Sequence, residues 1–158
     1  MVLNDPRCSA RIEMWNTWDV AENESVVHML EWIAHIAKKT DDGKFKNLVF
    51  NSHGSPASVK IGGRLKGLVE KIWFNGCEVA KPGDGVDDGL SFCSKIAKAA
   101  ECYVLASDTI QVDRVRLYQE VFKIAPLPRG KIGTFEGTLL SFARAALWRA
   151  YHVERSRH

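Results

Sequence analysis

The chain has no long apolar run and no large excess of charge, and its first residues predict no cleavable leader. No stretch of about 18 apolar residues occurs, so no membrane-spanning helix is predicted. The formal charge of +3 is too small to indicate a nucleic-acid partner, and the tail Arg155–His158 has the composition of a solvated end. The segment Met1–Trp15 has several charged residues and no apolar core, unlike a secretory signal peptide. We therefore expect a cytoplasmic protein with no membrane or nucleic-acid partner, and export without a cleaved signal stays open.

Cysteine is also scarce, and its spacing argues against a metal site. Cys8, Cys77, Cys93 and Cys102 form no Cys-x-x-Cys pair, and no histidine lies at zinc-finger spacing from them. No metal and no other cofactor is therefore expected. A chain of 158 residues buries about two-thirds of its unfolded surface, so it needs no disulfide framework. We predict that Cys8, Cys93 and Cys102 are structural, unpaired thiols.

The chain has no internal repeat, no low-complexity tract and no long linker, so residues 1–158 are predicted to form one domain. Its periodicity predicts strands at 11–15, 47–51, 71–75, 102–106 and 131–137, a hairpin arm at 58–61, a helical turn at 64–70, and helices at 23–39, 90–101 and 139–151. This alternation of strands and helices favours an α/β fold, with a mainly parallel sheet and helices on both faces.

The first predicted helix has an apolar stripe, formed by Val26, Val27, Leu30, Ile33, Ala34 and Ala37. Asn23 or Ser25 is expected to cap its start. His28 and His35 are seven residues apart, whereas metal-binding pairs on a helix need three- or four-residue spacing. We therefore expect these two histidines to be ordinary surface residues.

Two of the predicted strands end in the same way. One reads Leu-Val-Phe-Asn-Ser-His-Gly over residues 48–54, and the other reads Ile-Trp-Phe-Asn-Gly-Cys over residues 72–77. Each apolar run passes through small, turn-forming residues to one reactive side chain, His53 or Cys77. Neighbouring parallel strands end at a common sheet edge, where α/β folds build their sites. We predict that His53 and Cys77 lie side by side there as a nucleophile–base pair, because an adjacent imidazole favours the reactive thiolate.

These motifs resemble those of the caspase-like cysteine peptidases of clan CD, in which a strand ending in His-Gly precedes a strand ending in a small residue and Cys. The chain is still more similar to an uncharacterised bacterial domain of that superfamily, often found near the start of large surface proteins. The shared motifs are Ser-His-Gly-Ser-Pro at 52–56, Gly-Cys-x-Val-Ala at 76–80 and Ala-Ser-Asp at 106–108. The resemblance, which spans residues 47–108, implies a single caspase-like domain with a three-layer sandwich.

The chain departs from the superfamily in two respects. The separation of 24 residues between His53 and Cys77 is shorter than usual, which implies that the helix between the two strands is absent or reduced to a turn. The part of the chain after Asp108 has no clear counterpart of a second subunit and no processing site.

The resemblance implies a cysteine peptidase that cleaves peptide or protein substrates by acyl transfer. Cys77 would attack the peptide carbonyl as a thiolate, and His53 would protonate the leaving amine. The backbone N–H groups of Gly54 and Cys77 would stabilise the oxyanion. Asp108 would line the substrate pocket and favour Arg or Lys, with Glu78 as a weaker candidate. Asp108 has an alternative role as the cap of a turn or helix.

A catalytically inert module of the same fold, used for protein–protein interaction, is the alternative function. Trp15, Trp18 and Trp148 would then belong to an interface, whereas the tryptophans of a small domain usually pack in its core. A nucleotide-binding domain is not favoured, because no glycine-rich phosphate-binding motif follows a strand.

Overall fold

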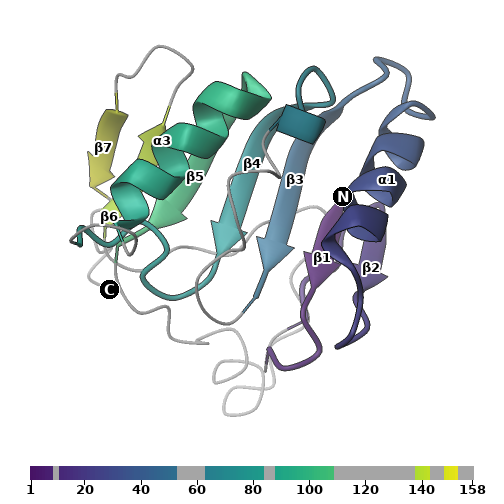
Figure 1. Cartoon of the computed structure of the whole chain (residues 1–158), viewed down its shortest axis with the longest axis horizontal. Coiled ribbons are helices and arrows are strands. Elements are labelled where there is room, and N and C mark those ends of the chain that lie inside the picture. The colour runs from purple at the N-terminus through teal and green to yellow at the C-terminus, as the bar shows by residue number, and fades with distance from the viewer. Residues whose placement is uncertain (9–10, 53–62, 84–87, 109–137, 143–147, 153–158) are drawn as a thin grey trace, which may run out of the picture.

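The computed structural model describes residues 1–8, 11–52, 63–83, 88–108, 138–142 and 148–152, with the backbone alone in the last two ranges. Its described strands form one sheet in the order β2-β1-β3-β4-β5-β6-β7 (Figure 1). The first five are parallel neighbours: β1 (Val2–Asn4), β2 (Thr17–Asp19), β3 (Phe45–Asn51), β4 (Val69–Asn75) and β5 (Tyr103–Ser107). The antiparallel strands β6 (Thr138–Phe142) and β7 (Trp148–His152) continue the sheet beyond β5. The predicted α/β fold with a mainly parallel sheet is therefore confirmed.

The centre of the sheet forms from the most apolar segments of the chain. Leu48, Ile72 and Val104 occupy matching positions on β3, β4 and β5, and all three side chains are fully buried. Because side chains alternate between the two faces of a strand, this row packs under the helices, while the residues on either side of it point the other way. The central stretches of β3, β4 and β5 are thus apolar on both faces, as is typical of a parallel sheet.

The two described helices, α1 (Val26–Ala37) and α3 (Gly89–Ala100), cover the same face of the sheet (Figure 1). Leu30 and Ile33 of α1 and Ile96 of α3 belong to one apolar cluster with the strand residues of that face. The crossovers β2–α1–β3 and β4–α3–β5 run in the same direction across the sheet, and right-handed crossovers then place both helices on one side.

The predicted helical layer on the opposite face has no counterpart among the described residues. That face is nevertheless covered in part, because Val2 and Val49, paired on β1 and β3, are fully buried outside the helix-facing cluster. Among the described helices, none is both long and apolar enough to cross a membrane.

The helix boundaries follow from local capping chemistry. Ser25 caps α1, because its side chain accepts a hydrogen bond from the backbone N–H of His28 at 3.1 Å. Asp88 caps α3 in the same way, accepting from the N–H groups of Leu90 and Ser91. Both predicted helices are present. The apolar stripe of α1 is narrower than predicted, because Val27 is 50% exposed.

The predicted first strand at 11–15 is wrong. The strands of this region are β1 and β2, on either side of it, and Arg11–Met14 forms no strand. The alternation there has a different cause: Arg11 and Glu13 form a surface ion pair, and Ile12 bonds the side chain of Asn4. The three-residue strand β1 is too short to produce a periodic signal, and pairing with β2 and β3 defines it.

The predicted helix at 139–151 is also wrong, because β6 and β7 occupy its two ends. Leucine and alanine at helical spacing predict a helix here. The segment forms strands instead, because β6 pairs with the backbone N–H and C=O groups at the open edge of β5. The helical turn predicted at 64–70 is wrong at its end, because β4 begins at Val69. The hairpin arm at 58–61 and the strand at 131–137 lie outside the described residues.

Candidate functional site

The parallel strands end together at one side of the sheet, which we call the carboxyl edge. It comprises the ends of β1, β3, β4 and β5 and the residues that directly follow them, and the strand arrowheads point toward it in Figure 1. From β1 the chain passes to β2 on one side, whereas from β3 it passes to β4 on the other side. Ligand crevices of open α/β sheets form at carboxyl ends where successive connections diverge in this way. This divergence lies between β1 and β3, on the same carboxyl edge as the motifs that follow β3, β4 and β5.

A row of asparagines crosses the carboxyl edge. The Nδ2 of Asn75 donates to the Oδ1 of Asn51 at 2.8 Å, and the Nδ2 of Asn51 donates to the Oδ1 of Asn4 at 2.9 Å. Asn4 donates in turn to the Oδ1 of Asp19 at 3.2 Å. The row joins the ends of β4, β3, β1 and β2 on the face opposite the helices. Because buried amides are costly unless they are paired, this hydrogen-bonded row fixes the register of the strand ends that precede the candidate site.

Sequence reasoning missed the asparagine row as a unit, although a signal for it exists. Three strands end in two apolar residues followed by asparagine, at residues 2–4, 49–51 and 73–75. In a parallel sheet such identical endings come into register, and the pairing of Asn4 with Asn51 and of Asn51 with Asn75 bears this out.

Cys77 lies in a turn that is firmly attached to β5. The backbone N–H of Ala80 donates to the carbonyl of Ser107 at 2.9 Å, and Ala80 is fully buried. Lys81 closes the turn by donating its N–H to the carbonyl of Glu78 at 3.0 Å. The turn after β4 therefore lies against the end of β5, so Cys77 and Asp108 belong to adjoining segments of the carboxyl edge.

The start of α3 supports the same turn from the other side. A Cβ placed on Gly89 would lie 2.3 Å from the carbonyl oxygen of Val79 and 2.7 Å from the backbone nitrogen of Lys81. The N–H of Gly89 also donates to the carbonyl of Lys81 at 2.9 Å. Only glycine allows this close approach of helix and turn.

Glu78, directly after Cys77, has an unusual backbone conformation with φ of 56°. A non-glycine residue in the left-handed region is uncommon, and such strain is concentrated at functional sites. The other described non-glycine residue with positive φ, Glu101 at 53°, has an ordinary structural explanation because it ends α3. The Glu78 carboxylate pairs with the ammonium of Lys81 at 2.9 Å, so it is already engaged.

Asp108 follows β5 directly. Its Oδ1 is buried and has no hydrogen-bond partner in the described part of the chain. An acceptor left in this state is costly in an isolated protein, and a cationic or N–H donor from a ligand would satisfy it. The alternative capping role of Asp108 involves the segment from residue 109 onward, which is outside the described residues.

The four cysteines, all in the described ranges, form no disulfide and differ in their surroundings. Cys93 and Cys102 are buried in the apolar core, as predicted, and burial raises the pKa of each thiol to about 12. Cys77 and Cys8 are half-buried. Since the thiolate is the nucleophile, the two core cysteines are chemically silent at neutral pH, whereas Cys77 has solvent access.

His53 and Gly54, predicted as the base and as an oxyanion donor, lie outside the described residues. The strand before them is described. β3 and β4 are parallel neighbours, and Asn51 pairs with Asn75, so His53 and Cys77 each stand two residues beyond a matched pair.

The three tryptophans of the alternative interface, Trp15, Trp18 and Trp148, have different environments. Trp15 is 74% exposed, whereas Trp18 is half-buried and packs against the core. Trp148 lies in β7, where the backbone alone is described. His28 and His35 are exposed on α1, as predicted, and no group of three potential metal ligands occurs within the described ranges.

Comparison with known proteins identifies no relative: no family model matches the chain, and no similar curated protein or solved structure was found.

Proposed function

We propose that this protein is a cysteine peptidase of caspase-like type, with Cys77 as the nucleophile and His53 as the general acid–base residue. The observation that carries the proposal is the register of β3 and β4. Asn51 and Asn75 are paired, and the same two-residue step leads from each of them to His53 and to Cys77. Neighbouring strands lie about 5 Å apart, which is within the reach of a histidine and a cysteine side chain.

The chemistry is acyl transfer. The Cys77 thiolate forms a bond to the peptide carbonyl carbon, and the carbon–nitrogen bond breaks as the His53 imidazolium gives its proton to the leaving amine. A water molecule, deprotonated by His53, then attacks the thioester and releases the acid product together with the Cys77 thiolate. The N–H groups of Gly54 and Cys77 are the proposed oxyanion donors. The strained conformation of Glu78 and the attachment of the turn to β5 and α3 support a preorganised N–H at Cys77.

The substrate preference in this proposal is cleavage after Arg or Lys. Support comes from the buried Oδ1 of Asp108, which has no partner in the described ranges and would receive a cationic substrate side chain. Glu78 is the less suitable anion, because Lys81 neutralises it. We place this activity in the cytoplasm, where thiols stay reduced.

Thiol labelling combined with substrate profiling tests the proposal. The full chain should alkylate at Cys77 far faster than a free thiol at neutral pH, and His53→Ala should slow that labelling about tenfold or more, because the thiolate loses its partner. A peptide library should show cleavage after Arg or Lys that Cys77→Ser abolishes, and Asp108→Asn should weaken that preference. Cys8→Ser, at the other half-buried thiol, is the matched control and should change nothing.

Ordinary reactivity of Cys77 would contradict the peptidase and would favour the inert interaction module, for which exposed Trp15 supplies contact area. Cleavage after acidic or apolar residues would remove the role of Asp108 and leave the dyad standing.

A further inference from the structure

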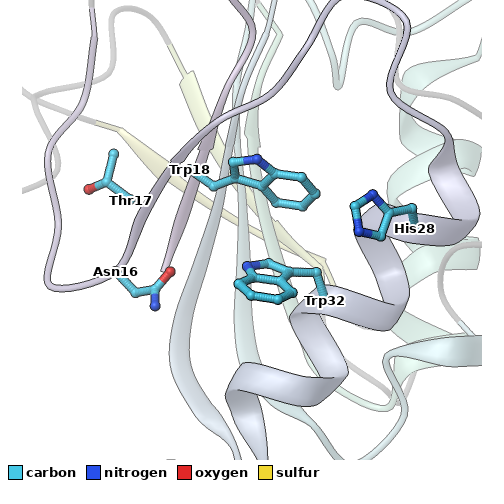
Figure 2. Close-up of a pocket in the computed structure, with 5 residues that line it drawn as sticks. All are labelled: Asn16, Thr17, Trp18, His28 and Trp32. Carbon is cyan, nitrogen blue, oxygen red and sulfur yellow. The ribbon is translucent and has the colours of Figure 1, made fainter.

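A hollow lies away from the carboxyl edge, between the edge strand β2 and the helix α1. We call it the aromatic hollow; its volume is about 340 Å³, and it is lined by Asn16, Thr17, Trp18, His28 and Trp32. Figure 2 shows the rings of Trp18 and Trp32 next to each other, with His28 beside Trp18 and the polar pair Asn16 and Thr17 across from them. The volume suits a small organic group.

The rings of the hollow hold one another in place. Trp18 meets His28 edge to face at 5.6 Å between ring centroids, and it meets Trp32 in the same manner at 6.2 Å. Trp32 also stacks on His35 at 5.5 Å with 29° between the ring planes. Trp32 nevertheless remains 41% exposed. The hollow thus offers two indole rings, kept rigid by their neighbours and open to a ligand.

The carboxylate of Glu24, just before α1, lies next to one of these rings. His28, Glu31, Trp32 and His35 recur at three- and four-residue steps, so they share the solvent face of α1. One turn earlier, the Oε1 of Glu24 lies 2.8 Å from the Nδ1 of His28. The hydrogen bond from His28 lowers the pKa of Glu24, so this carboxylate stays ionised at neutral pH. A carboxylate is therefore held within hydrogen-bond distance of the His28 ring, which lines the hollow.

The part of the chain that builds the hollow is acidic in a basic protein. Residues 12–37 include Glu13, Asp19, Glu22, Glu24 and Glu31 but no lysine or arginine, whereas the whole chain has a formal charge of +3. The nearest arginine in the sequence, Arg11, is engaged by Asp19 and Glu13. The segment that builds the hollow therefore carries more carboxylates than basic side chains, and these carboxylates flank the hollow in the sequence without lining it.

We propose that the aromatic hollow binds an organic cation, with an alkylated ammonium group seated against Trp18 and Trp32. Indole is the best aromatic partner for a cation, and ammonium groups without N–H donors are recognised by such rings. An anionic ligand is not favoured, because residues 12–37 carry five carboxylates and no lysine or arginine. A metal ion is not favoured, since no suitable group of ligands gathers within the described residues. The site is separate from the cysteine chemistry and does not depend on it.

Calorimetric titration with choline, paired with its neutral isostere 3,3-dimethylbutan-1-ol, tests the proposal on the full chain. Choline should bind saturably, and the isostere should bind about tenfold more weakly, because it has the same shape without the charge. Trp32→Ala should weaken choline binding about tenfold. Trp15→Ala is the matched control, because Trp15 is more exposed and does not line the hollow; it should leave the affinity unchanged.

Glu24→Gln tests the charge without altering the rings, and its choline affinity should fall while the unfolding midpoint stays close to that of the parent. A trimethyllysine peptide is titrated beside free choline. Tighter binding of the peptide would identify a protein-borne cation as the ligand, and tighter binding of choline would identify a small molecule. Equal binding of choline and its isostere, no saturable choline binding, or full affinity in both Trp32→Ala and Glu24→Gln would each overturn the proposal.

Discussion

The carboxyl edge and the aromatic hollow are built in opposite ways. At the carboxyl edge, small polar side chains and backbone groups are fixed by strand register, by the buried asparagine row and by the close approach of Gly89. In the hollow, large rings from an edge strand and from a helix surface pack together at the solvent-exposed surface, where Trp32 is 41% exposed. The edge therefore has the rigidity that chemistry at one atom needs, whereas the hollow has the exposed aromatic area that binding needs.

The two regions also tolerate change differently. A substitution at the carboxyl edge disturbs backbone packing that reaches the core, so stability and reactivity should fall together. A substitution on the solvent face of α1 removes contact area and should leave the fold unchanged. The following experiments test this contrast.

The largest expected effect is on thiol reactivity. Burial raises the pKa of Cys93 and Cys102 from 9.0 to about 12, so near neutral pH each has about a thousandfold less thiolate than an ordinary cysteine. Limited labelling with iodoacetamide, followed by peptide mass spectrometry, should therefore modify half-buried Cys77 far faster than either core cysteine. In denaturant all four cysteines should label alike. Comparable labelling of Cys93 in the native protein would mean that α3 does not cover it stably.

The next largest effect is expected for Gly89→Ala. Glycine-to-alanine changes in helices are usually stabilising, but here the added Cβ would overlap the backbone of Val79 and Lys81. We expect the free energy of unfolding to fall by about 2–3 kcal/mol in urea denaturation, and Cys77 labelling to change with it. Gly63→Ala is the control, because a Cβ there has nothing within 4 Å. Unchanged stability in Gly89→Ala would show that the turn after β4 is not held as described.

Loss of the central asparagine should have a smaller cost. Asn51 is only 4% exposed, and Asn51→Ala removes the acceptor of the Asn75 amide. It also removes one of two donors to the Oδ1 of Asn4, which keeps the N–H of Ile12. Unfolding experiments should show a loss of about 2 kcal/mol. Asn23→Ala, at an exposed position before α1, should be close to neutral. A neutral Asn51→Ala would indicate that water replaces the amide and that the row does not fix the edge.

The smallest effects should separate the two regions most clearly. Ser25→Ala and Asp88→Ala remove the N-caps of α1 and α3, at about 1 kcal/mol each. Since α1 carries the hollow and α3 supports the turn of Cys77, Ser25→Ala should weaken choline binding alone, and Asp88→Ala should alter Cys77 labelling alone. Both readouts measured on both variants test this, and a change of both readouts in either variant would show that the regions are coupled.

The long central elements could be predicted from the sequence because their signals are local. β3, β4 and β5 are dense apolar runs ended by turn residues, and α1 and α3 have clear apolar stripes with good caps. The burial of Cys93 followed from its place in the stripe of α3. The shared edge followed from the rule that parallel strands end together, which is why the turn of Cys77 and the segment of Asp108 adjoin.

The errors arose where a long-range partner decides the structure. β1 is three residues long and exists because β2 and β3 pair with it on both sides, whereas the more strand-like alternation at 11–15 has no such partner. β6 and β7 form where a helix was predicted, because β6 pairs with the otherwise open edge of β5 and β7 pairs with β6. Neither requirement is visible in a local window of sequence.

The sequence by itself therefore determined the α/β class, the main elements and the edge at which Cys77 stands, since hydrophobic periodicity and turn residues act over a few positions. The tertiary structure alone decided the asparagine row, the close fit of Gly89 under the turn and the meeting of Trp18 with Trp32. Each of these depends on strand register or on the packing of a helix against a strand. Such contacts join residues that are 8 to 47 positions apart in the chain and belong to different elements, so local periodicity does not show them.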